Sequence, residues 1–89
     1  MGSAAVISFE DKAFAEYRQW EIDDKNVFKK INALLTEIIR DPFQGTGKPE
    51  PLKWNWAGHW SRRINDEHRL VYRVLNDHVI IASCKYHYS

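Results

Sequence analysis

The strongest periodic pattern in the chain is DKNVFKKINALLTEIIR, residues 24–40. Its apolar side chains recur at the spacing of one helix face; they are Val27, Ile31, Leu34, Leu35, Ile38 and Ile39. Asp23-Asp24 offers an N-cap, and Arg40-Asp41-Pro42 ends the pattern because proline removes a helix hydrogen bond. The stretch therefore predicts an amphipathic helix whose apolar face needs a partner surface.

The residues before this helix predict a strand followed by another helix. From about Asp11, the side chains of Phe14, Tyr17 and Trp20 follow at helical spacing, with acidic residues early, where the helix dipole favours them. Residues 4–9 form a short apolar run that fits a buried strand.

The residues after it predict a sheet. Three runs rich in Ile, Val, Tyr and Leu span 60–65, 69–75 and 79–88, separated by polar turns. Such runs are typical of an antiparallel meander. The order β-α-α-β-β-β then predicts one α+β domain over residues 1–89, with an antiparallel sheet and two helices packed on one face.

A long connection separates the helices from these runs. Residues 41–59 hold all the prolines of the chain and all but one of its glycines, a density that favours irregular structure. Long loops of this kind usually carry function. We expect four apolar side chains to anchor the loop to the rest of the domain: Phe43, Leu52, Trp54 and Trp56.

Charge is distributed unevenly along the chain. With 13 Lys+Arg and 12 Asp+Glu the net charge is only +1, which argues against a strongly basic nucleic-acid binder. Residues 1–41 carry −2, however, and residues 42–89 carry +3 together with all four histidines. We therefore expect any chemistry to lie in the second half.

Several classes of protein are excluded by composition. The single Cys84 allows no intramolecular disulfide, and the apolar runs are too short to span a bilayer, so a soluble cytoplasmic protein without a membrane partner is expected. On a regular strand, Cys84 and His87 would leave opposite faces, and we predict neither a metal nor a cofactor. Cys84 is instead expected to be a small core residue. The chain has no Gly-x-Ser-x-Gly elbow and no P-loop.

What remains is an inventory of acid–base and anion-binding groups: Glu50, Lys53, Arg62, Arg63, Glu67, Arg69, His87 and Tyr88. Cleavage of RNA without a metal needs a base for the 2′-OH, cations for the phosphate and an acid for the leaving oxygen. Aromatic residues nearby could stack on unpaired bases. The plainer alternative is a solvated loop, an exposed Arg62-Arg63 pair, a charged turn, and tryptophans and Tyr86 that only pack.

Four blocks of sequence resemble one protein family. They are PFQGTGKPEPLK (42–53), GHWSRRI (58–64), EHRLVY (67–72) and CKYHY (84–88). In order and spacing they are similar to the YoeB family of toxins, in the RelE superfamily. The resemblance implies a compact RelE-like fold and a ribosome-dependent, metal-independent mRNA endonuclease that cuts in the ribosomal A site. Trp54 and Trp56 make the loop unusually aromatic for the family, and Ser89 follows the tyrosine, Tyr88, at which such chains normally end.

The resemblance also implies roles for individual residues. Glu50 matches the general base, His87 the general acid, and Arg69 the arginine that stabilises the scissile phosphate. Lys53 and Arg63 match phosphate-binding positions, and Tyr88 one that orients the leaving group. Glu67 lines the same site, where its charge suggests that it fixes Arg63 or Arg69.

The partners implied are mRNA on the ribosome, a YefM-type antitoxin, and operator DNA only through the antitoxin complex, with the toxin as a homodimer. Two alternatives remain open from the sequence. One is a catalytically silent, antitoxin-binding corepressor, and the other is a plain RNA-binding module.

Overall fold

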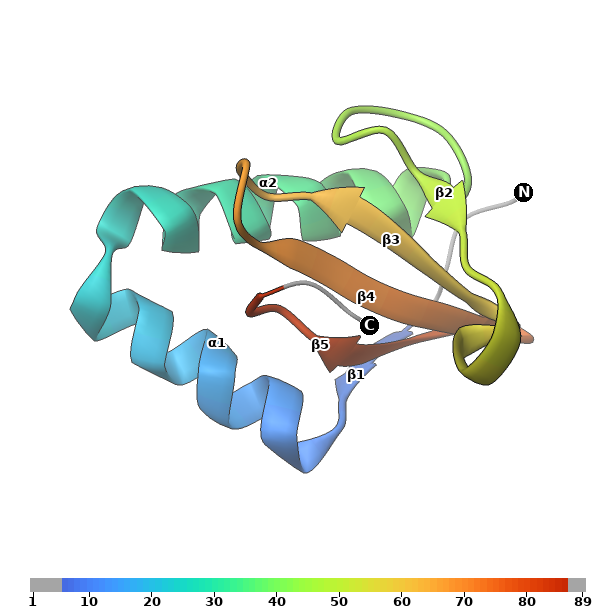
Figure 1. The fold of residues 1–89 in the computed structure, drawn as a ribbon, viewed down its shortest axis with the longest axis horizontal. Coiled ribbons are helices and arrows are strands. Elements are labelled where there is room, and N and C mark those ends of the chain that lie inside the picture. Colours follow the sequence, from blue (N-terminus) through green and yellow to red (C-terminus); the bar gives the residue numbers. More distant parts are fainter. Residues whose placement is uncertain (1–5, 87–89) are drawn as a thin grey trace.

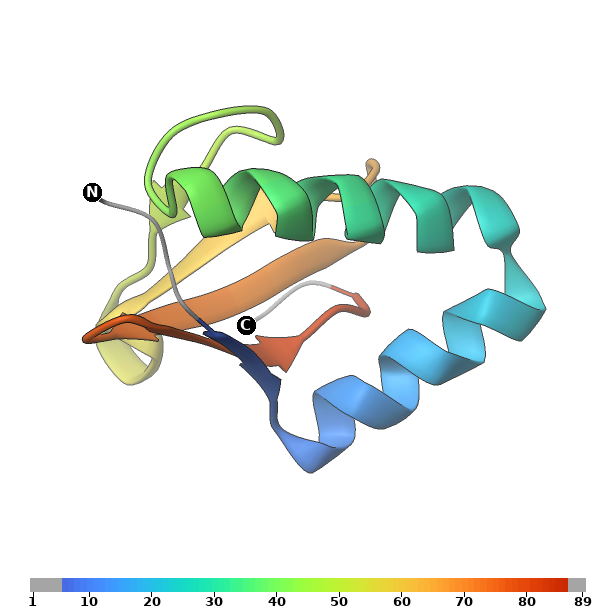
Figure 2. The same cartoon turned by 180° about the vertical axis from the view of Figure 1, so that it is seen from behind.

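A computed structural model describes residues 6–86 and shows a five-stranded sheet with two helices on one face (Figures 1 and 2). The helices are α1 (Asp11–Asp23) and α2 (Lys25–Arg40), and a 3-10 turn spans Trp54–Trp56. The strands are β1 (Val6–Phe9), β2 (Glu50–Pro51), β3 (His59–Arg63), β4 (Arg69–Leu75) and β5 (His78–Ser83). Their order across the sheet is β1-β5-β4-β3-β2. The α+β class, the two predicted helices and the single covered face are confirmed.

Helix α2 forms as its sequence pattern predicts. The Asp24 carboxylate accepts hydrogen bonds from the backbone N–H groups of Asn26 and Val27, which satisfies two of the otherwise unpaired donors of the first turn. The helix ends at Arg40, two residues before Pro42. Its predicted apolar face packs on the sheet through four buried side chains: Val27, Ile31, Leu34 and Ile38.

Helix α1 is less amphipathic and is held at the β5 side of the sheet by specific contacts. Its buried Trp20 donates a hydrogen bond from Nε1 to the carbonyl of Cys84, at 2.9 Å. Rings from three elements also pack in a row, with Tyr17 5.1 Å from Phe9 and 4.9 Å from Phe28 between centroids. These contacts join β1, α1 and α2 at one edge of the core.

The sheet is mixed, which corrects the prediction that it is antiparallel throughout. Strand β1 pairs with β5 in parallel, with Ile7 opposite Val79, whereas the other pairs are antiparallel. A parallel pair needs a long crossover connection, and the helices and later strands between β1 and β5 supply it. The runs predicted at 60–65 and 69–75 correspond to β3 and β4, but the run predicted at 79–88 is too long. Strand β5 ends at Ser83, and the next N–H, that of Cys84, donates to the Glu16 carboxylate at 2.9 Å.

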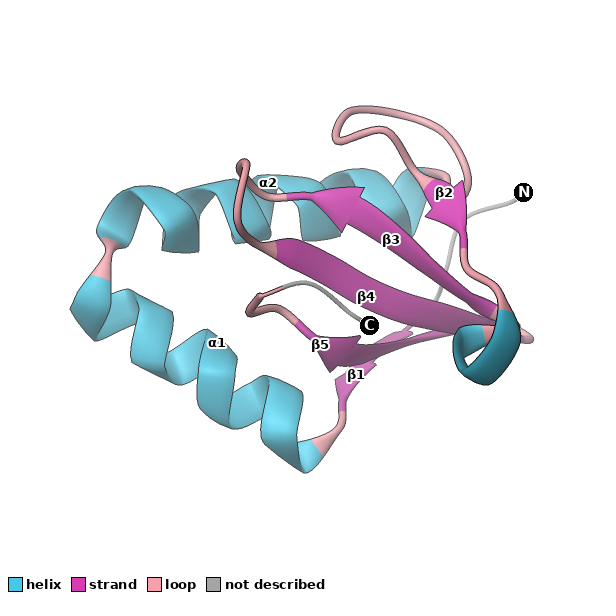
Figure 3. Cartoon of the chain, in the orientation of Figure 1, coloured by secondary structure: helices cyan, strands magenta, loops and turns pink. Residues whose placement is uncertain are grey.

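The two faces of the sheet are buried in different ways. The face toward the helices contributes Leu70, Tyr72 and Ile81 to the main core. On the opposite face, here called the open face, Leu52, Val71 and Ala82 form a smaller buried cluster against which Trp56 packs. The segment that follows α2 therefore packs on the open face through Leu52 and Trp56, and Figure 3 shows its loops in pink and its 3-10 turn in cyan.

That loop is more ordered than predicted. It contains β2 and the 3-10 turn, and its Leu52 and Trp56 anchor it to the open face as expected. Phe43 packs on Trp60 with ring centroids 4.8 Å apart. The prediction for Trp54 is wrong, because its side chain is 88% exposed and its backbone takes the left-handed φ of 54°.

Cys84 is a core residue, as predicted. Its side chain is fully buried, and this burial raises the pKa of the thiol to about 12, so the thiol stays protonated and unreactive at neutral pH. Across residues 6–86, no group of three or more His, Cys, Asp or Glu side chains is placed to hold a metal ion. Neither helix in this part of the chain is long and apolar enough to cross a membrane.

Candidate active site

Strand register brings three predicted site residues to the open face. Glu50 pairs with Ser61 across β2 and β3, and Ser61 pairs with Val71 across β3 and β4. Arg63 pairs directly with Arg69, two residues further along the same strands. Residues opposite one another, or two apart on a strand, share a face. Glu50, Arg63 and Arg69 therefore stand on the same face as Val71, away from the helices.

The Arg63–Arg69 pair concentrates positive charge at one end of this face. Like charges directly opposite one another destabilise a sheet, so the pair has an energetic cost that a bound anion would relieve. Arg69 is held in place because Nη1 donates to the carbonyls of Asn65, at 2.8 Å, and His68, at 3.2 Å. Arg63 is exposed. The two guanidinium groups suit an oxyanion such as a phosphate.

Glu50 lies at the edge of a hollow formed by β2 and the 3-10 turn. The hollow has a volume of about 350 Å³, and Lys53, Trp54 and Trp56 also line it. A second hollow of about 290 Å³ is lined by Trp56, Val71 and Tyr86 among others. Trp56 lines both depressions, so one residue borders the hollow at Glu50 and the hollow at Tyr86.

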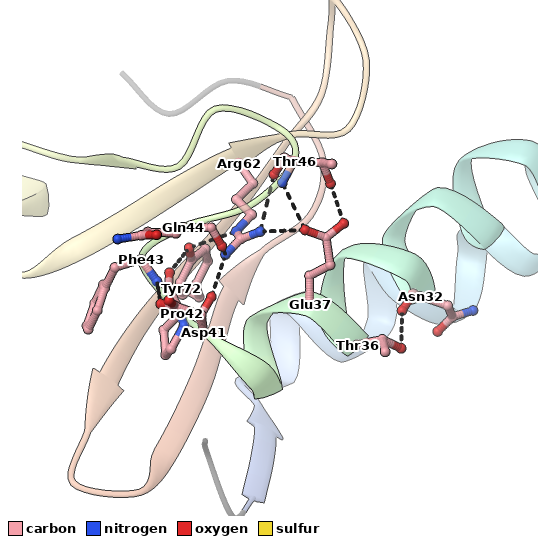
Figure 4. A network of polar contacts seen from close by, with 10 residues as sticks. All are labelled: Asn32, Thr36, Glu37, Asp41, Pro42, Phe43, Gln44, Thr46, Arg62 and Tyr72. Atoms are coloured by element: carbon pink, nitrogen blue, oxygen red, sulfur yellow. Dashed lines mark hydrogen bonds and ion pairs between the residues drawn. The ribbon is translucent and has the colours of Figure 1, made fainter. Parts of the chain in front are cut away.

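The loop that carries Glu50 is fixed to β3 by Arg62, whose side chain is fully buried (Figure 4). Its Nη2 donates to the carbonyls of Asp41 and Gln44, both at 2.8 Å, and its Nη1 donates to the carbonyl of Thr46 at 3.2 Å. Its Nε donates to the hydroxyl of Tyr72 at 3.1 Å. The alternative of an exposed arginine pair is thus wrong for Arg62 and right only for Arg63.

Two further contacts complete the attachment of the loop. The Tyr72 hydroxyl donates to the carbonyl of Pro42 at 2.6 Å, and the Arg63 N–H donates to the carbonyl of Gly47 at 2.6 Å. Gly47 has a φ of 83°, and a Cβ there would lie 2.9 Å from the Arg63 carbonyl oxygen. Only glycine allows this close approach of loop and strand.

Glu37 on α2 ties the tip of the loop to the helix. Its carboxylate accepts from the Thr46 N–H, at 2.8 Å, and from the Thr46 hydroxyl, and it lies 3.5 Å from Nη1 of Arg62. The hydrogen bonds from Thr46, aided by the charge of Arg62, lower the pKa of Glu37 from its ordinary value. The ionised carboxylate is therefore part of the loop attachment.

The chain passes close to Arg69 just before the predicted catalytic C-terminus. The Arg69 N–H donates to the carbonyl of Tyr86 at 3.2 Å, and the Tyr86 N–H donates to Nδ1 of His68 at 2.8 Å. Tyr86 is 56% exposed, so the alternative that it is a core residue is wrong. The predicted site residues His87 and Tyr88 lie outside the described residues.

Glu67 does not have the predicted contacts. It lies in the turn between β3 and β4, where its Oε1 is 3.6 Å from Nε2 of His68, and Arg69 is held by turn carbonyls instead. Sequence reasoning also missed the structural roles of Arg62 and His68. A signal for Arg62 was present, because it lies between Trp60 and Ile64 on the alternation that faces the core.

Comparison with known proteins identifies the family of the chain. Residues 9–88 match the model of a family described as the YoeB-like toxin of bacterial type II toxin–antitoxin systems. The chain belongs to this family. It is 53% identical over 78 residues to Toxin YoeB of Escherichia coli K12, covering 88% of this chain and 93% of the relative. It is 49% identical over 82 residues to Toxin YoeB of Streptomyces coelicolor, covering 92% and 98%.

Solved structures of related toxins share the fold. A YoeB/ParE toxin from Agrobacterium tumefaciens superposes with a TM-score of 0.89 at 42% identity, over 92% of this chain and 98% of that one. The chain in a heterotetrameric YoeB–YefM complex from Staphylococcus aureus gives 0.86 at 54% identity, over 92% and 95%. The RelE-like fold implied by the sequence is confirmed.

The buried network predicts a large difference between two adjacent arginines. Arg62→Met removes the donors to three loop carbonyls, and breaking such a buried charged network costs roughly 3–5 kcal/mol. Arg63→Met, on the exposed side of the same strand, should change the free energy of unfolding by less than about 0.5 kcal/mol. Urea unfolding of both variants measures the difference. Equal effects would show that Arg62 does not hold the loop.

The Glu37 contacts predict a pH-dependent contribution to stability. Because folding lowers the pKa of Glu37 from 4.5, the ionised carboxylate stabilises the folded state above that pH. The contribution disappears as the pH falls through the folded-state value. Glu37→Gln should therefore lose stability relative to wild type near neutral pH, and the difference should shrink in acid. Urea unfolding across this pH range, with Glu21→Gln on the exposed side of α1 as control, would reject the idea if the difference stayed constant.

Proposed function

We propose that this protein is a metal-independent endoribonuclease that cleaves mRNA in the ribosomal A site and thereby inhibits translation. Membership of the YoeB-like toxin family supports the proposal. The observation that carries it is the direct pairing of Arg63 with Arg69 on the same open face as Glu50. Two cations beside a carboxylate are what 2′-OH attack on a phosphate requires.

Each residue then has a role in the cleavage step. Glu50 accepts the proton of the ribose 2′-OH, and the freed oxygen attacks the adjacent phosphorus. Arg69 and Arg63 stabilise the charge that builds on the phosphate oxygens, while Lys53 holds the neighbouring phosphate. The bond from phosphorus to the 5′ oxygen breaks and that oxygen takes a proton, which leaves a 2′,3′-cyclic phosphate and a 5′-hydroxyl.

We assign the proton donor to His87, with Tyr88 orienting the leaving group. Both lie outside the described residues, and the support is the position of the chain just before them. The Tyr86 carbonyl accepts from the Arg69 N–H at 3.2 Å, so the segment that carries His87 starts beside the proposed phosphate site. A carboxylate base and an imidazole acid can work together near neutral pH.

Dependence on the ribosome follows from charge. A protein with a net charge of +1 gains little from neutralising phosphates along free RNA. A ribosome presents the codon in a fixed geometry and so supplies the orientation that raises the rate. Trp54, 88% exposed on the rim of the Glu50 hollow, is placed to stack on an unpaired base. We therefore propose that the protein acts in the cytoplasm, where ribosomes translate mRNA.

The proposed partner in regulation is a YefM-type antitoxin. Related chains from Staphylococcus aureus occur in a YoeB–YefM complex and as a YoeB dimer. The basic end of the open face suits an acidic segment that folds across it. We infer that this protein likewise forms a homodimer, binds such an antitoxin, and reaches operator DNA only through the complex.

The proposal predicts cleavage that depends on both Glu50 and His87. On purified ribosomes programmed with a defined mRNA, primer extension should find cuts confined to the A-site codon, and modest EDTA that spares the ribosome should not prevent them. Glu50→Ala and His87→Gln should each lower the rate by about 100-fold or more.

Lys29→Ala, on the exposed side of α2, is the matched control and should cleave like wild type. If folded wild-type protein binds the antitoxin but does not cut, the chain is a silent corepressor of the same fold. Rapid cutting of free RNA without ribosomes would contradict the dependence on the ribosome.

A further inference from the structure

His68 is a buried histidine that contacts both Arg69, in the proposed phosphate site, and Tyr86, which precedes the proposed general acid. Only 6% of its surface is exposed. Its ring meets Trp20 edge-on with centroids 4.7 Å apart, and the ring of Tyr86 is 5.3 Å away on the chain leading to the C-terminus. It immediately precedes Arg69, the first residue of β4.

The contacts of the imidazole define its protonation. Nδ1 accepts a hydrogen bond from the Tyr86 N–H at 2.8 Å, so this nitrogen carries no proton. A neutral imidazole has one N–H, which must then be on Nε2. Nε2 lies 3.6 Å from the Glu67 carboxylate, the side on which a donor is favoured. The hydrogen-bond network thus assigns the neutral Nε2–H tautomer.

The backbone of the same residue holds Arg69. The His68 carbonyl accepts from Nη1 of Arg69 at 3.2 Å and from the N–H of Ile64 at 3.0 Å. The His68 N–H donates to the side chain of Asn65 at 2.7 Å, which fixes the turn. One residue therefore orients the arginine through its backbone and the C-terminal segment through its ring.

The C-terminal segment has a separate anchor upstream of this contact. At Cys84, the carbonyl accepts from Trp20 and the N–H donates to Glu16, both at 2.9 Å. Loss of the His68 ring contact would leave the chain anchored at Cys84, and the Tyr86 carbonyl would still accept from the Arg69 N–H. The direct effect is therefore on the Tyr86 N–H, in the segment that leads to His87.

We propose that His68 is a positioning residue: through Nδ1 it fixes Tyr86, the residue just before the proposed general acid, beside Arg69 of the proposed phosphate site. The inference rests on the proposed function. His68 does not touch RNA and acts only through Tyr86 and Arg69. Glu67, whose predicted contacts with Arg63 or Arg69 are absent, assists instead by keeping the proton on Nε2 of His68.

The test compares substitutions that keep or remove the acceptor. His68→Asn places an amide oxygen near the position of Nδ1, whereas His68→Phe keeps the packing against Trp20 and Tyr86 but has no acceptor. Asp66→Asn, exposed in the same turn, is the control. The readouts are the single-turnover cleavage rate on ribosomes and the toxin concentration that gives half the maximal rate.

His68→Phe should lower the single-turnover rate by roughly 10- to 100-fold, because small displacements of a reacting group have effects of this size. His68→Asn should recover most of that rate, and neither variant should change the half-maximal concentration appreciably. Equal rates in the Phe and Asn variants, or a change in the half-maximal concentration alone, would overturn the positioning role.

A second measurement is independent of catalysis. Nitrogen NMR of wild type should show His68 Nδ1 unprotonated and Nε2 protonated, and amide exchange at Tyr86 should be slow in wild type and His68→Asn but fast in His68→Phe. Slow exchange in all three proteins would refute the inference even if the protein cleaves RNA. If wild type shows the expected exchange but does not cleave, the proposed function fails while the contact stands.

Discussion

The buried guanidinium of Arg62 attaches the loop that follows α2 to the sheet. It donates to three carbonyls of the loop that follows α2 and to the hydroxyl of Tyr72 in β4. A buried charge is tolerated only when its donors are satisfied, so the loop and the arginine require one another. With the loop fixed, β2 can add to the edge of β3 and bring Glu50 to the open face. The proposed base thus depends on an arginine on the opposite face.

Strand alternation explains how two adjacent arginines differ. Arg62 points into the core beside Tyr72, while Arg63, one residue later, stands on the open face opposite Arg69. A slip of one residue in the β3–β4 register would exchange their environments. Both the stability of the loop and the charge of the proposed site therefore depend on this register, which the large core residues Leu70 and Tyr72 specify by their burial.

The sequence predicted the features that follow from local pattern. Helix α2, its Asp24 cap, β4 and the burial of Cys84 follow from periodicity and composition. The parallel β1–β5 pair did not, because strand direction is set by tertiary packing. Trp54 looked like an anchor, yet it is 88% exposed, and its backbone has a left-handed φ of 54°. The contacts of Arg62 and Glu67 also depend on how distant segments pack together, and these contacts cannot be inferred from a single sequence.

Attack by the ribose 2′-OH is the chemical step that Glu50, Arg63 and Arg69 are proposed to promote. The most informative measurement replaces that hydroxyl alone, using an mRNA with a single 2′-deoxy nucleotide at the mapped cleavage position on programmed ribosomes. The mechanism predicts that wild-type protein no longer cuts there, although it still binds the ribosome and cuts the all-ribose message to a 5′-hydroxyl product. Cutting at the deoxy position at an unchanged rate would contradict it, because the proposed nucleophile would be absent.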